Sequence, residues 1–178
     1  MSDIMIRSAT VGDAEAILNI YGPYVQNTAI SMEYEVPTLE EFKQRVENTL
    51  KSYPYLVAEQ DGKIIGYAYA GRFHPRAAFY RSAEMSIYLD KAVHKCGLGR
   101  KLYEMIEEKL KEQGILNVYA SIAYTDKEDE YLTNNSTQFH EHMGYTKVAQ
   151  FNNCCYKFGR WYHLIWMEKM IGEHKTTS

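Results

Sequence analysis

The sequence is poor in cysteine, in basic charge and in long apolar runs. It has three cysteines, of which Cys154 and Cys155 are adjacent, and no Cys-x-x-Cys pair. An odd number without metal-site spacing argues against a disulfide framework and gives no sign of a zinc site. The formal net charge of −3 leaves no basic stripe for nucleic acid or an anionic membrane. Because no leader and no bilayer-length apolar run is present, we expect a cytoplasmic protein that binds neither nucleic acid nor membrane.

Several ligand-binding signatures are missing as well. No Gly-x-x-x-x-Gly-Lys-Ser/Thr string is present, and the dinucleotide fingerprint that would follow Gly97 and Gly99 meets Leu102 where its third glycine belongs. The acidic residues 126–130 lack the glycine and the spacing of a calcium loop, so we expect a solvated insertion there. We therefore expect no metal.

A strand, a glycine turn and a helix between residues 84 and 114 organise the chain. Apolar and polar residues alternate over 84–89, which predicts a strand. After Gly97 and Gly99, apolar residues recur every four positions up to Leu110 and predict a helix with one buried face. Two residues without Cβ at the start of that helix let backbone N–H groups approach a phosphate or pyrophosphate closely. The alternative is a tight turn with no ligand.

The remaining pattern alternates helices and strands. Thr38 and Glu41 have the spacing of a capping box at the start of a helix. Asp61-Gly62 between two apolar segments predicts a hairpin turn. Gly22-Pro23 is expected to end the first helix near Tyr24, and the end of the chain is expected to form separate strands at 145–152, 156–158 and 161–169.

The glycine turn carries a resemblance to a known family. His94-Lys95-Cys96-Gly97-Leu98-Gly99 resembles the coenzyme A pyrophosphate loop of the GNAT acyltransferases, with His94 in place of the usual Gln or Arg. Further strings resemble the phosphinothricin acetyltransferase-like group of that superfamily: Tyr53-Pro54-Tyr55-Leu56-Val57-Ala58-Glu59, Gly66-Tyr67-Ala68-Tyr69-Ala70, Pro75-Arg76-Ala77-Ala78, Glu84-Met85-Ser86-Ile87-Tyr88, His140-Glu141-His142-Met143-Gly144-Tyr145 and Tyr156-Lys157-Phe158-Gly159-Arg160-Trp161.

The resemblance implies a fold and a cosubstrate. It implies an α/β (α+β) GNAT fold, with a central mixed, mostly antiparallel twisted sheet flanked by helices. A single N-acetyltransferase domain would span residues 1–172, and we expect residues 173–178 to be a disordered tail. Acetyl-CoA would be the cosubstrate, without a metal, and the protein would be a homodimer with an interface at the aromatic segment 156–166.

The resemblance also implies roles for site residues. Glu84 would be the general base, the alternative being a solvated carboxylate at a strand end. His140 would act as general acid near the sulfur, the alternative being a structural histidine. Asn135 would cap a short helix and touch the pantetheine. The expected contacts with the coenzyme are Ile87, Tyr88, Leu89, Lys95, Cys96, Gly97, Leu98, Gly99, Arg100 and Asn135.

The acceptor implied by the resemblance is a small amino acid or analogue with an anionic group, such as phosphinothricin or methionine sulfoximine or sulfone. A guanidinium can hold such an anion with two parallel hydrogen bonds, which favours Arg76 as its partner. The expected substrate contacts are Met32, His74, Arg76, Phe79, Ser86 and Tyr88. A protein or polyamine acetyltransferase and a non-catalytic acyl-CoA sensor are the alternatives.

Overall fold

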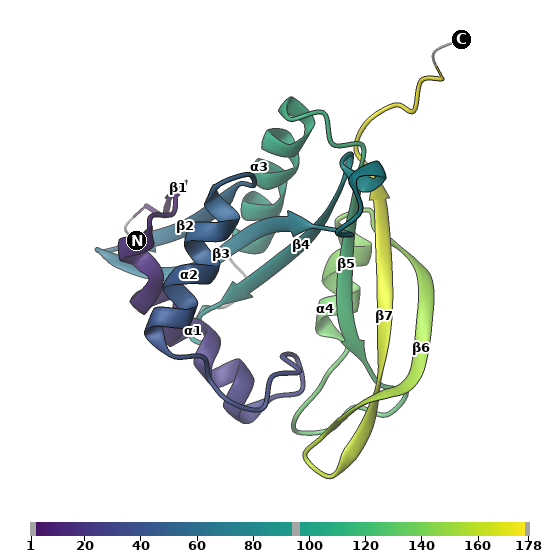
Figure 1. Ribbon diagram of the computed structural model, residues 1–178. Coiled ribbons are helices and arrows are strands. Elements are labelled where there is room, and N and C mark those ends of the chain that lie inside the picture. Colours follow the sequence, from purple (N-terminus) through teal and green to yellow (C-terminus); the bar gives the residue numbers. More distant parts are fainter. Residues whose placement is uncertain (1–2, 94–96, 177–178) are drawn as a thin grey trace.

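The computed structural model describes residues 3–93 and 97–176, so the predicted coenzyme contacts Lys95 and Cys96 lie outside the described residues. Within these residues a seven-stranded sheet runs through the molecule in the order β1-β2-β3-β4-β5-β7-β6 (Figure 1). Neighbouring strands are antiparallel, except that β4 and β5 are parallel. The predicted mixed, mostly antiparallel sheet is thereby confirmed. The strands are Met5–Ser8 (β1), Tyr55–Gln60 (β2), Lys63–Arg72 (β3), Ser82–Leu89 (β4), Asn117–Tyr124 (β5), Thr146–Lys157 (β6) and Arg160–Met170 (β7).

Helices cover both faces of the sheet (Figure 1). One face of β2 and β3 packs against α1 and α2, and the other face packs against α3. Within β2, Leu56 and Ala58 belong to the apolar cluster with α3, whereas Tyr55 and Val57 belong to the cluster with α1 and α2. This is the two-residue period of a strand buried on both faces. The helices are Ala14–Asn27 (α1), Leu39–Leu50 (α2), Leu98–Glu112 (α3) and Asn135–His142 (α4), with short 3₁₀ turns at Val11–Asp13 (η1) and Ala77–Phe79 (η2).

Local signals predicted two features correctly. The Thr38 hydroxyl accepts from the Glu41 N–H at 3.2 Å and the Glu41 carboxylate accepts from the Thr38 N–H at 2.8 Å, so the capping box begins α2. Asp61 and Gly62 adopt φ values of 53° and 75°, the left-handed conformation that a tight hairpin turn between β2 and β3 needs.

The prediction that the first helix ends near Tyr24 was wrong. Helix α1 continues through Pro23 to Asn27, although proline lacks an N–H and crowds the carbonyl four residues earlier. The last turn buries Val25, which is 1% exposed. Burial of that side chain offsets the lost hydrogen bond, and the Val25 carbonyl is capped by the ammonium of Lys157 at 2.7 Å.

The acidic segment 126–130 is mostly exposed, as predicted for a solvated insertion, but three of its carboxylates also have partners in the protein. Asp129 forms an ion pair with Arg160, Asp126 lies 3.1 Å from His163, and the Glu128 carboxylate accepts from the Asn134 N–H at 2.8 Å. Arg160, far along the chain, therefore ties this segment to β7 through Asp129.

Strand β6 is continuous where two strands were predicted. The register with β7 shifts between Phe151 and Cys155, and Asn153 has a φ of 49°. A bulge of this kind interrupts the ladder without ending the strand, which is why the sequence pattern looked broken there. In the part of the chain that the structure describes, no helix is long and apolar enough to cross a bilayer.

Candidate active site

The sheet opens between β4 and β5. Their parallel pairing joins Ser82–Glu84 to Asn117–Tyr119 and extends no further, and the two strands then diverge (Figure 1). The next residues of β4 and of β5, Met85–Tyr88 and Ala120–Ala123, line a cavity of about 60 Å³. The divergence leaves the facing strand edges unpaired with each other, so their backbone groups are available to a ligand.

A larger channel of about 550 Å³ adjoins this cavity. The two spaces share Ile30, Ile87, Tyr88 and Ser136. The channel runs between the end of β4, the start of α3 and one side of α4, and its lining is mostly apolar. The predicted coenzyme contacts that come together in it are Ile87, Tyr88, Leu89, Gly97, Leu98, Gly99, Arg100 and Asn135.

The two glycines at the start of α3 have different structural roles. Gly97 has a φ of 70° and a Cβ there would meet nothing within 4 Å, so the residue supplies a left-handed turn beside open space. A Cβ on Gly99 would lie 3.1 Å from the Phe139 ring, so this glycine lets α3 approach α4. The first N–H groups of α3 have no partner within the helix, and the positive end of its dipole favours an anion. The turn and the helix start therefore fit a pyrophosphate.

Two predicted coenzyme contacts have other partners as well. The guanidinium of Arg100 contacts Glu104 at 3.3 Å and donates to the His142 carbonyl at 3.2 Å, while the side chain stays exposed at the channel. Asn135 is the first residue of α4, and the N-cap position is taken by Asn134. The prediction that Asn135 caps this helix was wrong by one residue.

Glu84 lies at the point where β4 and β5 part. Burial raises the pKa of its carboxyl above the ordinary value for glutamate. This carboxylate forms no hydrogen bond or ion pair with any of the residues that the structure describes. In the register between β3 and β4, Glu84 lies opposite Gly71. A Cβ on Gly71 would meet nothing within 4 Å, so there is open space next to the sheet at this position. Glu84 therefore has the two properties of a base, a raised pKa and room for a substrate.

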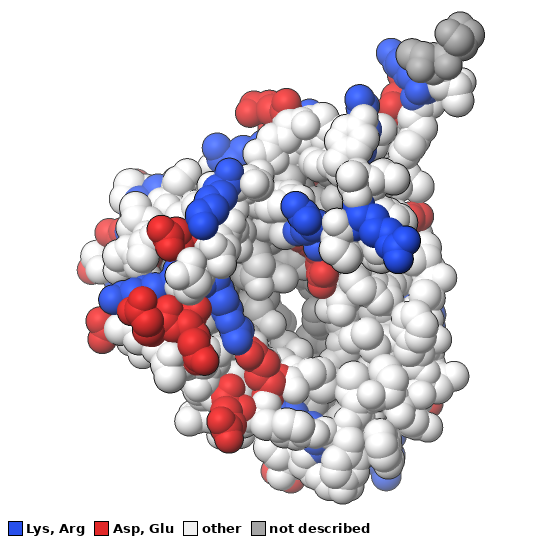
Figure 2. Space-filling view, in the orientation of Figure 1, with Lys and Arg blue, Asp and Glu red and all other residues white. Residues whose placement is uncertain are grey.

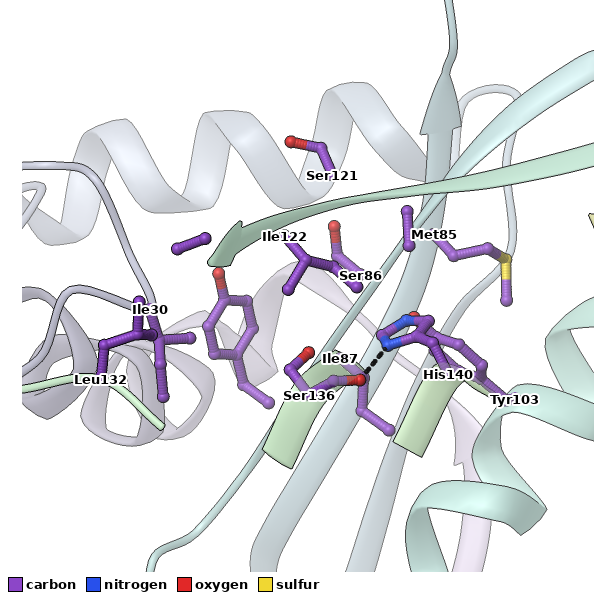
Figure 3. A pocket seen from close by; sticks show the side chains of 13 residues that line it. Ile30, Met85, Ser86, Ile87, Tyr103, Ser121, Ile122, Leu132, Ser136 and His140 are labelled. Carbon is purple, nitrogen blue, oxygen red and sulfur yellow. Dashed lines mark hydrogen bonds between the residues drawn. The ribbon is translucent and has the colours of Figure 1, made fainter. Parts of the chain in front are cut away.

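His140 is buried, 3% exposed, and hydrogen-bonded at both ring nitrogens. Figure 3 shows the hydrogen bond with Ser136. Its Nδ1 lies 2.7 Å from the Ser136 carbonyl oxygen, which can only accept, so Nδ1 carries the hydrogen. Its Nε2 lies 2.8 Å from the Tyr103 hydroxyl and, in the neutral ring, accepts from it. Burial lowers the pKa of His140 to about 4. The ring is therefore neutral near pH 7, and the single hydroxyl hydrogen of Tyr103 is donated to it at this end of the cavity.

The loop between β3 and β4 carries the predicted anion contacts. His74 packs on the Phe79 ring with centroids 4.5 Å apart, and Phe73 stacks on Tyr119 at 4.1 Å. Tyr119 is the register partner of Glu84, so this loop is anchored at the same end of the β4–β5 opening. Arg76 is exposed on it. Figure 2 shows basic side chains at the rim of a hollow in this face of the molecule.

The other predicted substrate contacts lie apart from that loop. Ser86 lines the cavity and its side chain is hydrogen-bonded to Tyr69. Tyr88 also lines the cavity, and its ring packs edge-on against Tyr21 and Tyr24 with centroids 5.1 Å away. Met32 packs against a small cluster that includes Leu132, and it lines neither the cavity nor the channel.

Several residues that line the cavity were not predicted from the sequence, among them Ile30, Tyr103, Ser121 and Ser136. Tyr103 had a usable signal, because Gly99, Tyr103 and Glu107 repeat every four residues beside the apolar stripe of α3. All three are buried. Ser121 and Ser136 had none, since small polar residues are found equally often in turns.

Comparisons of the sequence and of the structure with known proteins all find acetyltransferases. A family model described as an acetyltransferase (GNAT) domain matches residues 6–166. A methionine sulfoximine/methionine sulfone acetyltransferase from Salmonella typhimurium is 32% identical over 95% of each chain. Phosphinothricin N-acetyltransferase from Streptomyces viridochromogenes is 30% identical over 89% of this chain and 83% of its own. The solved phosphinothricin acetyltransferase of Sinorhizobium meliloti, in complex with acetyl-CoA, superposes with a TM-score of 0.88 at 28% identity, covering 100% of this chain and 93% of that one.

Proposed function

Because the chain belongs to the GNAT acetyltransferase family, we propose that it moves an acetyl group from acetyl-CoA to the amine of a small amino acid or analogue with an anionic group. The observation that most directly supports this activity is the position of Glu84, a half-buried carboxylate with a raised pKa beside the opening between β4 and β5. Two relatives whose names state such acceptors support the substrate class. The exposed guanidinium of Arg76 on the adjoining loop supplies a partner for the anion.

Acetyl-CoA would lie in the channel, where the start of α3 would hold its pyrophosphate. When bound, it supplies an activated acyl carbon and a thiolate leaving group. The N–H groups at Leu98 and Gly99 and the Arg100 guanidinium are the groups that would bind phosphate oxygens. The free edge of β4 at Ile87, Tyr88 and Leu89 would hold the pantetheine like an added strand. Among residues 3–93 and 97–176 no group of three or more His, Cys, Asp or Glu side chains is arranged to hold a metal ion.

Glu84 would take the proton of the acceptor ammonium, directly or through a water. An α-ammonium ionises near pH 8, so the carboxylate is the weaker base. Burial raises the Glu84 pKa and narrows that difference. The amine freed in this way can attack the acyl carbon.

The departing sulfur would lie near Tyr103 and His140. His140 is neutral near pH 7, so it lacks the proton that the predicted general acid must give. Burial holds the pKa of Tyr103 well above its ordinary value. Its single hydrogen is donated to His140 Nε2, so the hydroxyl would stabilise the departing thiolate by turning this hydrogen bond from the histidine to the sulfur, without giving up the proton completely. We assign His140 the role of orienting that hydroxyl.

A thiol-release screen tests the proposal. Acetyl-CoA would be offered with amino acids, their sulfone and phosphinate analogues, polyamines and lysine peptides. We expect turnover with the anionic amino-acid analogues, and a higher KM for them in Arg76→Ala. Turnover with polyamines or peptides alone, unaffected by Arg76→Ala, would favour the other acetyltransferase functions. Binding of acetyl-CoA without turnover on any amine would favour a sensor.

Substitution of Glu84 tests its role as the base. Glu84→Gln keeps the shape of the side chain and removes the base, so kcat should fall by roughly 10²–10⁴. The affinity for acetyl-CoA, measured by calorimetry, should stay near that of the wild type. Glu108→Gln on the exposed side of α3 is the matched control. Loss of acetyl-CoA binding with unchanged kcat would make Glu84 a structural residue.

We also propose that the protein forms a homodimer through the β6–β7 hairpin. Large aromatic side chains are exposed on it, with Phe151 at 51%, Tyr156 at 49% and Trp161 at 57%. Aromatic residues gathered on one exposed element are typical of protein interfaces. Light scattering should give twice the chain mass, and Trp161→Lys should shift it toward the monomer. A wild-type monomer at micromolar concentration would contradict this.

A further inference from the structure

Two cations flank the turn between β6 and β7 and point into the protein. Lys157 is 3% exposed. Its ammonium donates to the carbonyls of Val25, Thr28 and Ser31 at 2.7, 2.9 and 2.7 Å. An ammonium has three hydrogens, so every donor is used. A buried ammonium is costly unless its donors are satisfied, which means that this residue holds the chain segment around it in one arrangement.

The segment held by Lys157 forms a wall of the catalytic cavity. Thr28 and Ser31 lie on either side of Ile30, whose side chain lines both the cavity and the channel. A second tie comes from the Tyr21 hydroxyl, 2.8 Å from the Ser31 hydroxyl. The backbone on both sides of Ile30 is thus fixed by a side chain more than a hundred residues away.

Arg160 holds a second wall of the same cavity. Its guanidinium pairs with one oxygen of Asp129 and donates to the Lys127 carbonyl at 2.6 Å. The other Asp129 oxygen accepts from the N–H groups of Tyr131 and Leu132, both at 2.9 Å. Leu132 lines the cavity. Arg160 therefore reaches this wall through one carboxylate.

The two walls meet each other at the cavity. The Ala29 N–H donates to the Tyr131 carbonyl at 3.0 Å, which joins the two loops directly. Figure 3 shows Ile30 and Leu132 side by side at one end of the cavity, away from Met85 and His140. In Figure 1 the loop between α1 and α2 approaches the far end of the β6–β7 hairpin.

We propose that Lys157 and Arg160 are positioning residues that set the shape of this end of the cavity and thereby select the acceptor. Within the described part of the chain neither forms a hydrogen bond or ion pair with α3 or α4, which with the end of β4 form most of the channel. The inference rests on the proposed function only for the identity of the molecule selected. Removing either cation should loosen this wall. Leu132 lines the cavity alone and Ile30 lines the channel as well, so we expect the rest of the coenzyme site, at α3, α4 and the end of β4, to stay intact.

Kinetics with both substrates tests this. In Lys157→Met and in Arg160→Met the KM for the acceptor should rise by about tenfold or more, the effect of losing one or more charged hydrogen bonds. The KM for acetyl-CoA should change by less than about threefold. A larger change in the acceptor KM than in the acetyl-CoA KM distinguishes a positioning role from general destabilisation of the protein. Lys147→Met is the matched control, because its ammonium lies on the same strand and contacts Gln150 at 2.9 Å. Equal rises in both KM values, or a fall in thermal stability with both KM values unchanged, would overturn the proposal.

Amide hydrogen exchange provides a test that needs no turnover. Exchange should quicken at residues 28–33 in Lys157→Met and at 129–132 in Arg160→Met, and at neither in Lys147→Met. Lys157→Gln keeps two N–H donors without the charge, so it serves if the methionine variant does not fold, with the same changes expected at smaller size. Unchanged exchange in these segments would refute the proposal. If the wild type acetylates no acceptor, the proposed function fails, and exchange still decides whether these cations hold the walls.

Discussion

The neutral, buried His140 makes the stability of the protein depend on pH in a defined window. In the folded state burial lowers its pKa to about 4, whereas an exposed histidine titrates near 6.5. As pH falls below 6.5, His140 becomes protonated in the unfolded chain but stays neutral in the folded protein. Stability is therefore highest above pH 6.5 and is lost as pH falls, until the folded ring also protonates near pH 4.

The magnitude follows from the difference between the two pKa values. A difference of one unit corresponds to about 1.4 kcal/mol, so His140 should remove about 2 kcal/mol of stability between pH 7 and pH 5, and about 3 kcal/mol by pH 4. His140→Gln lacks this titration. Its free energy of unfolding should therefore fall less steeply with acidification than that of the wild type, even if the variant is less stable at pH 7.

Urea denaturation at several pH values, followed by fluorescence of the two tryptophans, measures this slope. His142→Gln is the control, because it makes the same substitution at the neighbouring, exposed histidine of α4. Other groups, including Glu84, titrate in all three proteins and cancel in the comparison. Parallel curves for the wild type and His140→Gln would show that His140 is not held neutral. The interpretation of the Tyr103 hydroxyl as the O–H group at the sulfur would then be lost.

Further predictions concern the coenzyme turn and a buried ion pair. Gly97→Val should weaken acetyl-CoA binding in calorimetry with little change in fold, because a Cβ there faces open space but the φ of 70° suits only glycine. Gly99→Val should instead lower the stability of the fold, by about 1–3 kcal/mol, because the added atoms meet Phe139. If the wild type and both glycine variants bound acetyl-CoA equally well, the assignment of this turn to the pyrophosphate would be refuted. Lys169→Met should cost about 3–5 kcal/mol in urea denaturation, because it removes the cation 2.7 Å from the buried Glu107 carboxylate and leaves, among the described residues, only the Tyr145 hydroxyl as its partner. A cost below about 1 kcal/mol would mean that this pair is effectively solvated.

Short-range patterns in the sequence were enough to predict much of the framework. The capping box at Thr38, the hairpin turn at Asp61 and the apolar face of α3 each depend on residues a few positions apart, and the structure confirms all three. The family resemblance was carried by the glycine turn and the strings around it, and the family match over residues 6–166 confirms it. Eight of the ten predicted coenzyme contacts line one channel, because strand β4, the turn and α3 follow one another in the chain.

What the sequence left open depends on residues that are distant along the chain. Pro23 sits inside α1 because the helix end is buried and capped by Lys157, a contact across 132 residues. His140 is neutral because α4 packs against Tyr103 on α3, and its type alone suggested a proton donor. Arg160 pairs with Asp129 of the exposed acidic segment, a contact that local sequence patterns did not indicate. Periodicity and motif spacing report only neighbours, whereas burial and the pairing of charges are set when separate elements pack together, so only the tertiary structure could decide these points.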